Sequence, residues 1–389
     1  MAKPKSRGNS EGSIYQLKDG RWVAECMIGW RTTIDKKTGE LKQTRNIWKV
    51  YGKGRTEVKD KLIDMLKARK DGTFVEPNKT TFGVWLDEWM ETFKKRKLRP
   101  TTYESYEVMI RRHIKPALGH IPLKDLTALQ VQKLYNDKED AGLSARTIRY
   151  IHQIIHSALE KARQLKMVPF NVSEGAELPP LNAKQVQALS PDELEKFFRV
   201  CKQKTWQRWE PAFTLLVESG MRRGELLALQ WPDVDFESKL LSVRQGLTRT
   251  RTAGLQIAAP KTETAMRTIP LTPKAEAALR NQKRQQAQEK LLAGAAYQDN
   301  NLVFATEHGT PIEPRNLNRA FQRICQGAGI KATLHQLRHT FASRLIQAGA
   351  DVKTTSEILG HAKSNLTLDT YTHSSLERKR EAMRKLCEK

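Results

Sequence analysis

The residues best suited to chemistry lie between positions 222 and 373, and the most informative is an arginine on the apolar side of a predicted helix. In Leu334-His-Gln-Leu-Arg-His-Thr-Phe341, apolar residues recur at helical spacing, and Arg338 lies about 40° from the centre of their face. A guanidinium in such a place needs an anion, unless it extends outward to water. His335 and His339 flank it. A zinc site on these histidines is a weak alternative, because the glutamate of HExxH is missing.

Three further segments offer groups that are ordinary when taken singly. Arg222 and Glu225 stand three residues apart, so the carboxylate can orient the guanidinium, although such pairs are usually surface decoration. Lys261 falls at a turn, where a flexible ammonium could reach into a groove. Tyr371 follows His361 by ten residues, and a lone tyrosine is nearly always structural.

Taken together, in the order Arg…Lys…His-x-x-Arg…His…Tyr, the sequence resembles the tyrosine recombinases, in particular the integrases of phages and conjugative elements. The matching segments are Gly-Met-Arg222-Arg-Gly-Glu225-Leu, Pro-Lys261-Thr, Leu-His335-Gln-Leu-Arg338-His339-Thr, Leu-Gly-His361 and Thr-Tyr371-Thr-His373. Five motifs in this order are specific, and all six catalytic positions are filled.

The resemblance implies phosphoryl transfer from DNA to Tyr371, with a 3′-phosphotyrosyl bond formed and a 5′-hydroxyl released. Arg222, aligned by Glu225, and Arg338 would stabilise charge on the non-bridging oxygens. Lys261 is the candidate general acid. His335 would assist the tyrosine and His361 would bind the phosphate, with His339 and His373 in supporting roles. Since the phosphotyrosyl bond keeps the linkage energy, no nucleotide cofactor is expected, and the resemblance implies that no metal is used.

The composition independently indicates a polyanionic partner. The chain of 389 residues has 68 Lys+Arg against 43 Asp+Glu, a formal net charge of +25. Hydrophobic residues, at 39%, are sufficient for packed cores. No apolar stretch suits a membrane span, and the basic N-terminus lacks the apolar part of a signal peptide. The four cysteines are far apart and form no CxxC. We expect a location in a reducing bacterial cytoplasm, associated with the nucleoid.

Residues 1–75 predict a small unit of three strands and one helix. Asp19-Gly20 is a hairpin signal between Ser13–Leu17 and Trp22–Ile28, a third strand-like run follows at Thr44–Tyr51, and a helix begins near Thr56. This unit resembles the arm-site-binding domain of integrases. A sheet of this kind could enter a major groove, and its candidate DNA-binding residues are Arg21 and Arg45.

Residues 79–180 predict four helices, the second closed by Pro116, and resemble the core-site-binding domain of integrases. The long helix from Ser144 buries isoleucines on one side. Its other side carries the candidate DNA-binding residues Arg146, Arg149, His152 and Gln153. Such a polar face either contacts DNA or is only solvated.

The paired prolines of Glu177–Asn182 predict a linker before a catalytic domain at 181–389. That domain opens on a capping box at Ser190 and Glu193 and contains strand-like runs at 240–248, 255–259 and 267–271. The predicted class is mainly α with small β units (α+β), in the three-domain architecture of tyrosine recombinases. The charged segment Ser375–Lys389 is either a helix that docks on a neighbouring protomer or a frayed tail.

These observations predict a site-specific DNA recombinase that integrates or excises a mobile element. Its expected partners are double-stranded core and arm attachment sites, further copies of itself in a synaptic tetramer, and an accessory DNA-bending or directionality factor. A type IB topoisomerase shares the catalytic residues, but the N-terminal units favour the recombinase. A DNA-binding regulator would leave the Arg/Lys/His/Tyr set without a purpose.

Overall fold

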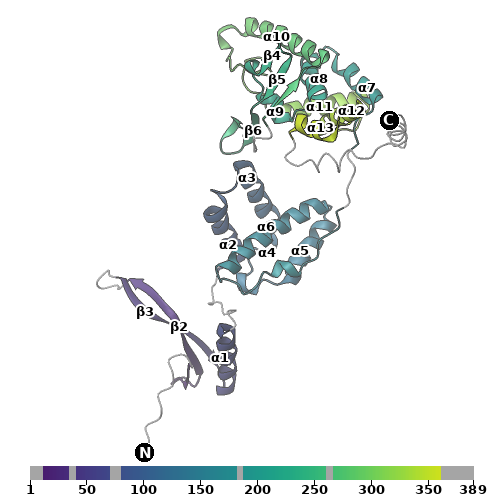
Figure 1. Cartoon of the computed structure of the whole chain (residues 1–389). Helices are drawn as coiled ribbons and strands as arrows, with labels where there is room; N and C mark the ends of the chain where they lie inside the picture. The colour runs from purple at the N-terminus through teal and green to yellow at the C-terminus, as the bar shows by residue number, and fades with distance from the viewer. Residues whose placement is uncertain (1–11, 35–40, 71–79, 182–186, 260–265, 361–389) are drawn as a thin grey trace, which may run out of the picture. The chain divides into compact units, whose positions relative to one another are not determined.

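The computed structural model describes residues 12–34, 41–70, 80–181, 187–259 and 266–360 (Figure 1). The chain divides into two compact units, Met1–Leu181 and Asn182–Lys389. Within the described residues, buried apolar side chains form three separate clusters, and no helix is long and apolar enough to cross a bilayer. The mainly helical class with small sheets is confirmed. The three predicted domain ranges stay a prediction.

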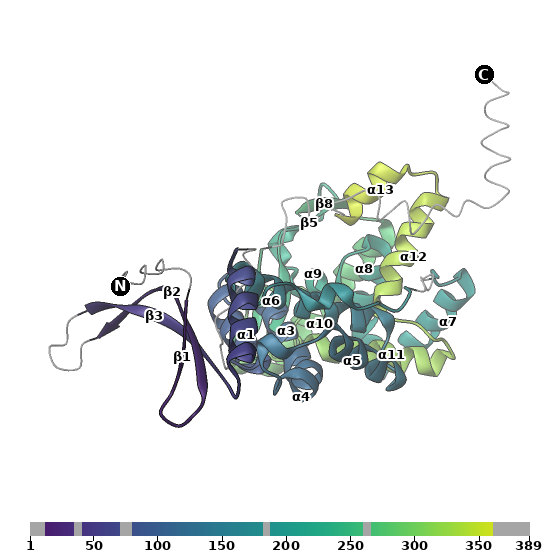
Figure 2. The same ribbon diagram turned by 90° about the horizontal axis from the view of Figure 1, so that it is seen from below.

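The described N-terminal elements are three antiparallel strands and a helix, as predicted. They are β1 (Ser13–Gln16), β2 (Trp22–Ile34), β3 (Leu41–Gly52) and α1 (Arg55–Lys70), with sheet order β1-β2-β3. Val58, Leu62 and Met65 of α1 pack on Ala24 and Cys26 of β2. Because β1 pairs only with residues 22–25, the remainder of β2 and β3 continues as a two-stranded ribbon (Figures 1 and 2).

A helical bundle makes up residues 80–181. Its helices are α2 (Phe82–Trp89), α3 (Pro100–Met109), α4 (Lys115–Leu118), α5 (Ala128–Asp140) and α6 (Ala145–Gln164). π-helical turns follow α2 at Met90–Lys94 and α3 at Ile110–Ile114. Short 3₁₀ turns lie at Leu123–Asp125 and Val172–Gly175. The expectation that Pro116 closes a helix is wrong. It lies in the first turn of α4, directly after the π-helical turn at Ile110–Ile114, and the helical run continues to Leu118.

The second unit packs helices around small antiparallel sheets. Its helices are α7 (Pro191–Cys201), α8 (Glu210–Ser219), α9 (Arg223–Ala228), α10 (Pro273–Ala293), α11 (Pro314–Ala328), α12 (Leu334–Gln347) and α13 (Val352–Leu359). Its strands are β4 (Val234–Asp235), β5 (Leu240–Val243), β6 (Gly246–Thr250), β7 (Gly254–Ala258) and β8 (Arg267–Pro270). There are 3₁₀ turns at Gln207–Trp209, Trp231–Asp233 and Gly294–Ala296.

The two described sheets of this unit have orders β4-β5-β8 and β6-β7. The expected single run at 240–248 is therefore wrong, because it divides into β5 and β6, which pair with different partners. The capping box is confirmed: Glu193 N donates to Ser190 Oγ, and Ser190 N donates to Glu193 Oε2. Gly220 and Gly360 end α8 and α13 in the left-handed conformation, at φ of 62° and 66°.

Candidate active site

Arg338 lies inside the second unit, on the inner side of α12. The residue is only 3% exposed, so its predicted burial is confirmed and the alternative of an outward arginine is wrong. Nη1 donates to the carbonyl of Gly220 at 2.8 Å, and Nη2 donates to that of Leu359 at 2.6 Å. Both acceptors lie at helix C-terminal ends, where carbonyls lack intrahelical partners and carry the negative end of the dipole. These carbonyls supply part of the negative potential that the buried guanidinium needs.

Arg222 occupies the N-cap of α9 and forms the predicted pair with Glu225. Its Nη1 donates to Glu225 Oε1 at 2.7 Å, and its backbone N–H donates to Oε2 at 2.8 Å. The carboxylate is therefore fixed over the first turn of α9, where the helix dipole favours an anion. Nη2 of Arg222 donates to the carbonyl of Gly360 at 3.1 Å.

Glu225 has a second guanidinium partner, Arg267, to which none of the sequence motifs assigns a role. Arg267 Nη2 lies 2.8 Å from Glu225 Oε2, and both side chains are almost fully buried. Burial raises the pKa of Glu225, but hydrogen bonds and charge from Arg267, with hydrogen bonds from Arg222, outweigh it and leave the pKa below its usual value. The one sequence signal was an arginine at the start of the strand-like run 267–271.

Three arginines hold three successive carbonyls at the end of α13. Arg267 Nε donates to Ile358, Arg338 Nη2 to Leu359, and Arg222 Nη2 to Gly360. The next residue in the sequence is His361. His361, Lys261, Tyr371 and His373 lie outside the described residues.

A cavity of about 540 Å³ joins the two predicted phosphate-binding arginines to a histidine. Arg222, His335 and Arg338 line it, together with Asn318 and Gln322 of α11. Partial loss of water and the charges of Arg338 and Arg222 lower the pKa of His335, so its ring is neutral at neutral pH. A neutral imidazole can accept a proton.

His339 stands one turn further along α12. Its ring is perpendicular to that of His335, with centroids 4.8 Å apart. Burial, together with His335 and Arg338, lowers the pKa of His339 to about 4. His339 is not among the residues that line the cavity.

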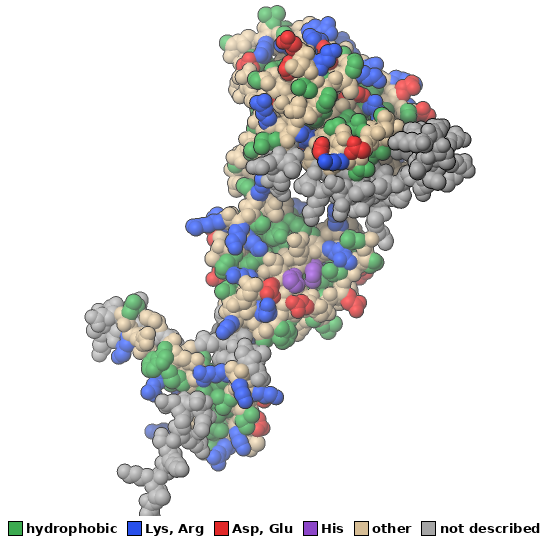
Figure 3. All heavy atoms as spheres, in the orientation of Figure 1, with side chains coloured by type: hydrophobic (Ala, Val, Ile, Leu, Met, Phe, Trp, Pro, Cys, Tyr) green, Lys and Arg blue, Asp and Glu red, His purple; other side chains and the backbone are tan. Residues whose placement is uncertain are grey.

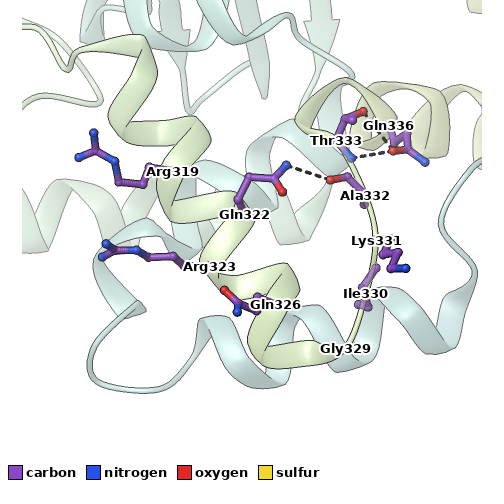
Figure 4. Close-up of a pocket in the computed structure, with 10 residues that line it drawn as sticks. All are labelled: Arg319, Gln322, Arg323, Gln326, Gly329, Ile330, Lys331, Ala332, Thr333 and Gln336. Atoms are coloured by element: carbon purple, nitrogen blue, oxygen red, sulfur yellow. Dashed lines mark hydrogen bonds between the residues drawn. The ribbon is translucent and has the colours of Figure 1, made fainter. Parts of the chain in front are cut away.

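A second, open pocket of about 800 Å³ adjoins this cavity, and both are lined by Gln322 and Thr333 (Figure 4). Its charged lining residues are Arg319 and Arg323 of α11 and Lys331 of the following connection, and no acidic residue lines it. The connection is held by Gln322 Nε2, which donates to the Ala332 carbonyl at 3.0 Å. A cationic surface therefore continues outward from the arginine cavity.

The DNA-binding candidates of the helical bundle lie on α6. Arg146 and Gln153 are exposed, whereas Arg149 Nε donates to the Pro179 carbonyl at 3.0 Å. His152 Nδ1 lies 2.9 Å from the Tyr135 hydroxyl, and burial is the main cause of its lowered pKa. His152 and Gln153 line a cleft with Lys94, Lys97 and Lys161. Histidine and Lys/Arg side chains are visible on this bundle in Figure 3.

The two candidates of the N-terminal sheet are both exposed. Arg21 pairs with Asp19 at 2.6 Å and lies over the ring of Tyr51, 5.6 Å from its centroid. Arg45 is on β3, directly opposite Trp30 on β2. Among the described residues, no group of three or more His, Cys, Asp or Glu could hold a metal ion.

Comparison with known proteins decides the family. The Phage integrase family matches residues 187–378, and the Phage integrase, N-terminal SAM-like domain matches residues 81–138. The chain belongs to the phage integrase family of tyrosine recombinases. This integrase is 28% identical over 355 residues to the "Tyrosine recombinase XerC-like" protein of Caldanaerobacter subterraneus subsp. tengcongensis, covering 86% of this chain and 90% of that protein. It is 24% identical over 380 residues to the ICEBs1 integrase of Bacillus subtilis, covering 96% and 99%.

Solved integrase structures share its fold. The Tn1549 transposon integrase in complex with transposon right end DNA matches with a TM-score of 0.66 at 24% identity, over 79% of this chain and 99% of that one. The lambda integrase tetramer bound to a Holliday junction matches with a TM-score of 0.58 at 19% identity, over 95% and 99%.

Proposed function

We propose that the chain is a site-specific DNA recombinase that cleaves and rejoins strands through a 3′-phosphotyrosyl intermediate, and so integrates or excises a mobile element. The observation that carries this proposal is the convergence of Arg222, His335 and Arg338 on one cavity. Two guanidinium groups at one small cavity suit a phosphate that gains negative charge in the transition state.

In the proposed reaction, Tyr371 Oη attacks the scissile phosphorus as the bond to the 5′ oxygen breaks. His335, whose lowered pKa keeps it neutral, would accept the phenolic proton. Lys261 gives a proton to the leaving 5′ oxygen, and His361 donates a hydrogen bond to the phosphate. Strand joining reverses these steps with a 5′-hydroxyl from another DNA end. Arg222 and Arg338 stabilise the charged phosphorus centre in both directions.

The backbone of the bound duplex is proposed to continue across the pocket of Arg319, Arg323 and Lys331. Three cations without an acidic neighbour in the lining favour successive phosphates. Replacing all three by glutamine removes up to three phosphate contacts. The slope of log K against log salt should then become less negative by about 2.7. Arg280→Gln, on the exposed face of α10, is the control and should leave the slope unchanged.

The proposed assembly is a synaptic tetramer on core and arm attachment sites, assisted by an accessory DNA-bending or directionality factor. The four α6 candidates would contact the core duplex: Arg146, Arg149, His152 and Gln153. Tyr135 would hold the ring of His152 in place, and the Pro179 carbonyl would hold Arg149. Arg21 and Arg45 would contact the arm duplex. A protein that acts on attachment sites in the chromosome would be associated with the bacterial nucleoid.

The test is covalent attachment to DNA in EDTA. A nicked duplex taken from the DNA flanking the gene is incubated with wild type, Tyr371→Phe and the control Tyr297→Phe, and adducts are resolved on a denaturing gel. We expect adducts from wild type and Tyr297→Phe only. Equal adducts from all three proteins would refute Tyr371 as the nucleophile. Equal adducts on unrelated DNA would favour a topoisomerase. Salt-sensitive binding without any adduct would favour a regulator.

A further inference from the structure

Arg267 is buried beside the proposed phosphate site but does not line its cavity. Its side chain is 5% exposed, against 41% for that of Arg222. Arg338 is as buried as Arg267, but it lines the cavity and Arg267 does not, so a phosphate in that cavity would not meet Arg267 directly. Any effect of Arg267 on the reaction must pass through the groups that it contacts.

Those contacts fix Arg267 from two directions. Nη2 reaches Glu225 Oε2 at 2.8 Å, and Nε donates to the Ile358 carbonyl at the end of α13. Its backbone is held as well, because β8 pairs with β5 at Val243. The guanidinium is planar, so two acceptors in different directions determine its orientation. Arg267 is therefore a rigid partner for Glu225.

Glu225 in turn is shared between a buried and a half-exposed arginine. Oε1 accepts from Arg222 Nη1, whereas Oε2 accepts from the Arg222 backbone and from Arg267. Arg222 thus uses one edge of its guanidinium on the carboxylate, and its side chain still reaches the cavity. Both arginines pair with the buried carboxylate, but of the two only Arg222 lines the cavity.

We propose that Arg267 is a positioning residue, which holds the Glu225 carboxylate in the orientation that aims Arg222 at the scissile phosphate. Without Arg267, the buried carboxylate has Arg222 as its nearest guanidinium, and that group is drawn inward. A displacement of about 1 Å at a reacting group can cost about 100-fold in rate. The inference rests on the proposed function, because it names a further residue for the same reaction.

The test measures adduct formation in single turnover, at saturating nicked duplex, for the full chain. Arg267→Gln should lower the rate constant by about 10- to 100-fold, with noncovalent DNA binding unchanged. Arg267→Lys keeps the charge but can reach only one of the two acceptors at a time, so it should recover part of the rate. Arg280→Gln removes an exposed arginine from its pair with Glu276 and should react like wild type.

A merely structural role would give a different result. It would lower the melting temperature and the adduct amplitude, while the remaining folded molecules reacted at the wild-type rate constant. That outcome, in Arg267→Gln or in the milder Arg267→Lys, would overturn the proposal.

A double-mutant cycle tests the route through Glu225. If Arg267 acts through this carboxylate, Glu225→Gln and Arg267→Gln together should cost little more than the worse single variant. Effects that multiply would overturn the proposal. Tyr371→Phe is run alongside, so that loss of the tyrosine-dependent reaction itself is recognised as a failure of the proposed function.

Discussion

A methyl group added at Gly220 would clash with apolar side chains that pack beside Arg338. Gly220 ends α8 at φ +62°, and a Cβ there would lie 2.4 Å from Phe341 Cδ1 and 2.8 Å from Leu359 Cδ2. The left-handed conformation costs an alanine about 1 kcal/mol relative to glycine. Relieving overlaps with two apolar side chains costs about 1–3 kcal/mol more. Gly220→Ala should therefore lower the free energy of unfolding by about 2–4 kcal/mol.

Gly329→Ala provides the matched control. Gly329 ends α11 at φ +68°, but a Cβ added there would meet no atom within 4 Å, so only the conformational cost of about 1 kcal/mol applies. For a unit of this size, 1 kcal/mol corresponds to about 2–4 °C in melting temperature. Calorimetry should show a loss of about 4–16 °C for Gly220→Ala and about 2–4 °C for Gly329→Ala.

Gly220→Ala should also slow the reaction. The Gly220 and Leu359 carbonyls both accept hydrogen bonds from Arg338, so moving α8 away from α13 disturbs the guanidinium. We expect adduct formation to slow by about tenfold at a temperature where the variant is folded. Equal melting temperatures for the two alanine variants, or an unchanged rate in Gly220→Ala, would refute this account of the packing.

Three further predictions concern charge. Because the pKa of Glu225 is lowered in the folded state, its ionised form stabilises the fold above the unfolded pKa, and this stability is lost as the pH falls through the folded pKa. In urea titrations at pH 7, Glu225→Gln should have a free energy of unfolding about 3 kcal/mol lower than wild type. Below pH 4.5, the free energy of unfolding should fall less in Glu225→Gln than in wild type. His339 has a folded pKa of about 4, so the stability present above pH 6.5, where its ring is neutral in both states, is lost as the pH falls from 6.5 to 4. In His339→Gln, the free energy of unfolding should depend less on pH in that window. An unchanged pH dependence would contradict the lowered pKa. Arg146→Gln should weaken core-duplex binding and reduce the salt slope by about 0.9, whereas Arg199→Gln on α7 should not.

Among the described residues, the sequence was sufficient to predict the helix that carries His335 and Arg338 and the helix ends beside it. Helical spacing placed Arg338 on an apolar face, and the capping residue at Ser190 and the glycines at 220 and 360 marked the ends of helices. These features depend on neighbours within a few positions, which is why a single sequence reveals them. Pro116 and the run at 240–248 were misread, because a π-helical turn and a change of strand partner depend on the packing around them.

The sequence by itself therefore determined the residue types of the chemistry, the order of the motifs and, among the described residues, the helix that carries His335 and Arg338. Only the tertiary structure decided which groups meet. Arg267 pairs with a carboxylate 42 positions away and a carbonyl 91 positions away, and Arg338 reaches a carbonyl 118 positions away. No spacing rule connects such residues. They meet because α8 and α13 end beside each other, and the unpaired carbonyls of those helix ends are what buried guanidinium groups require.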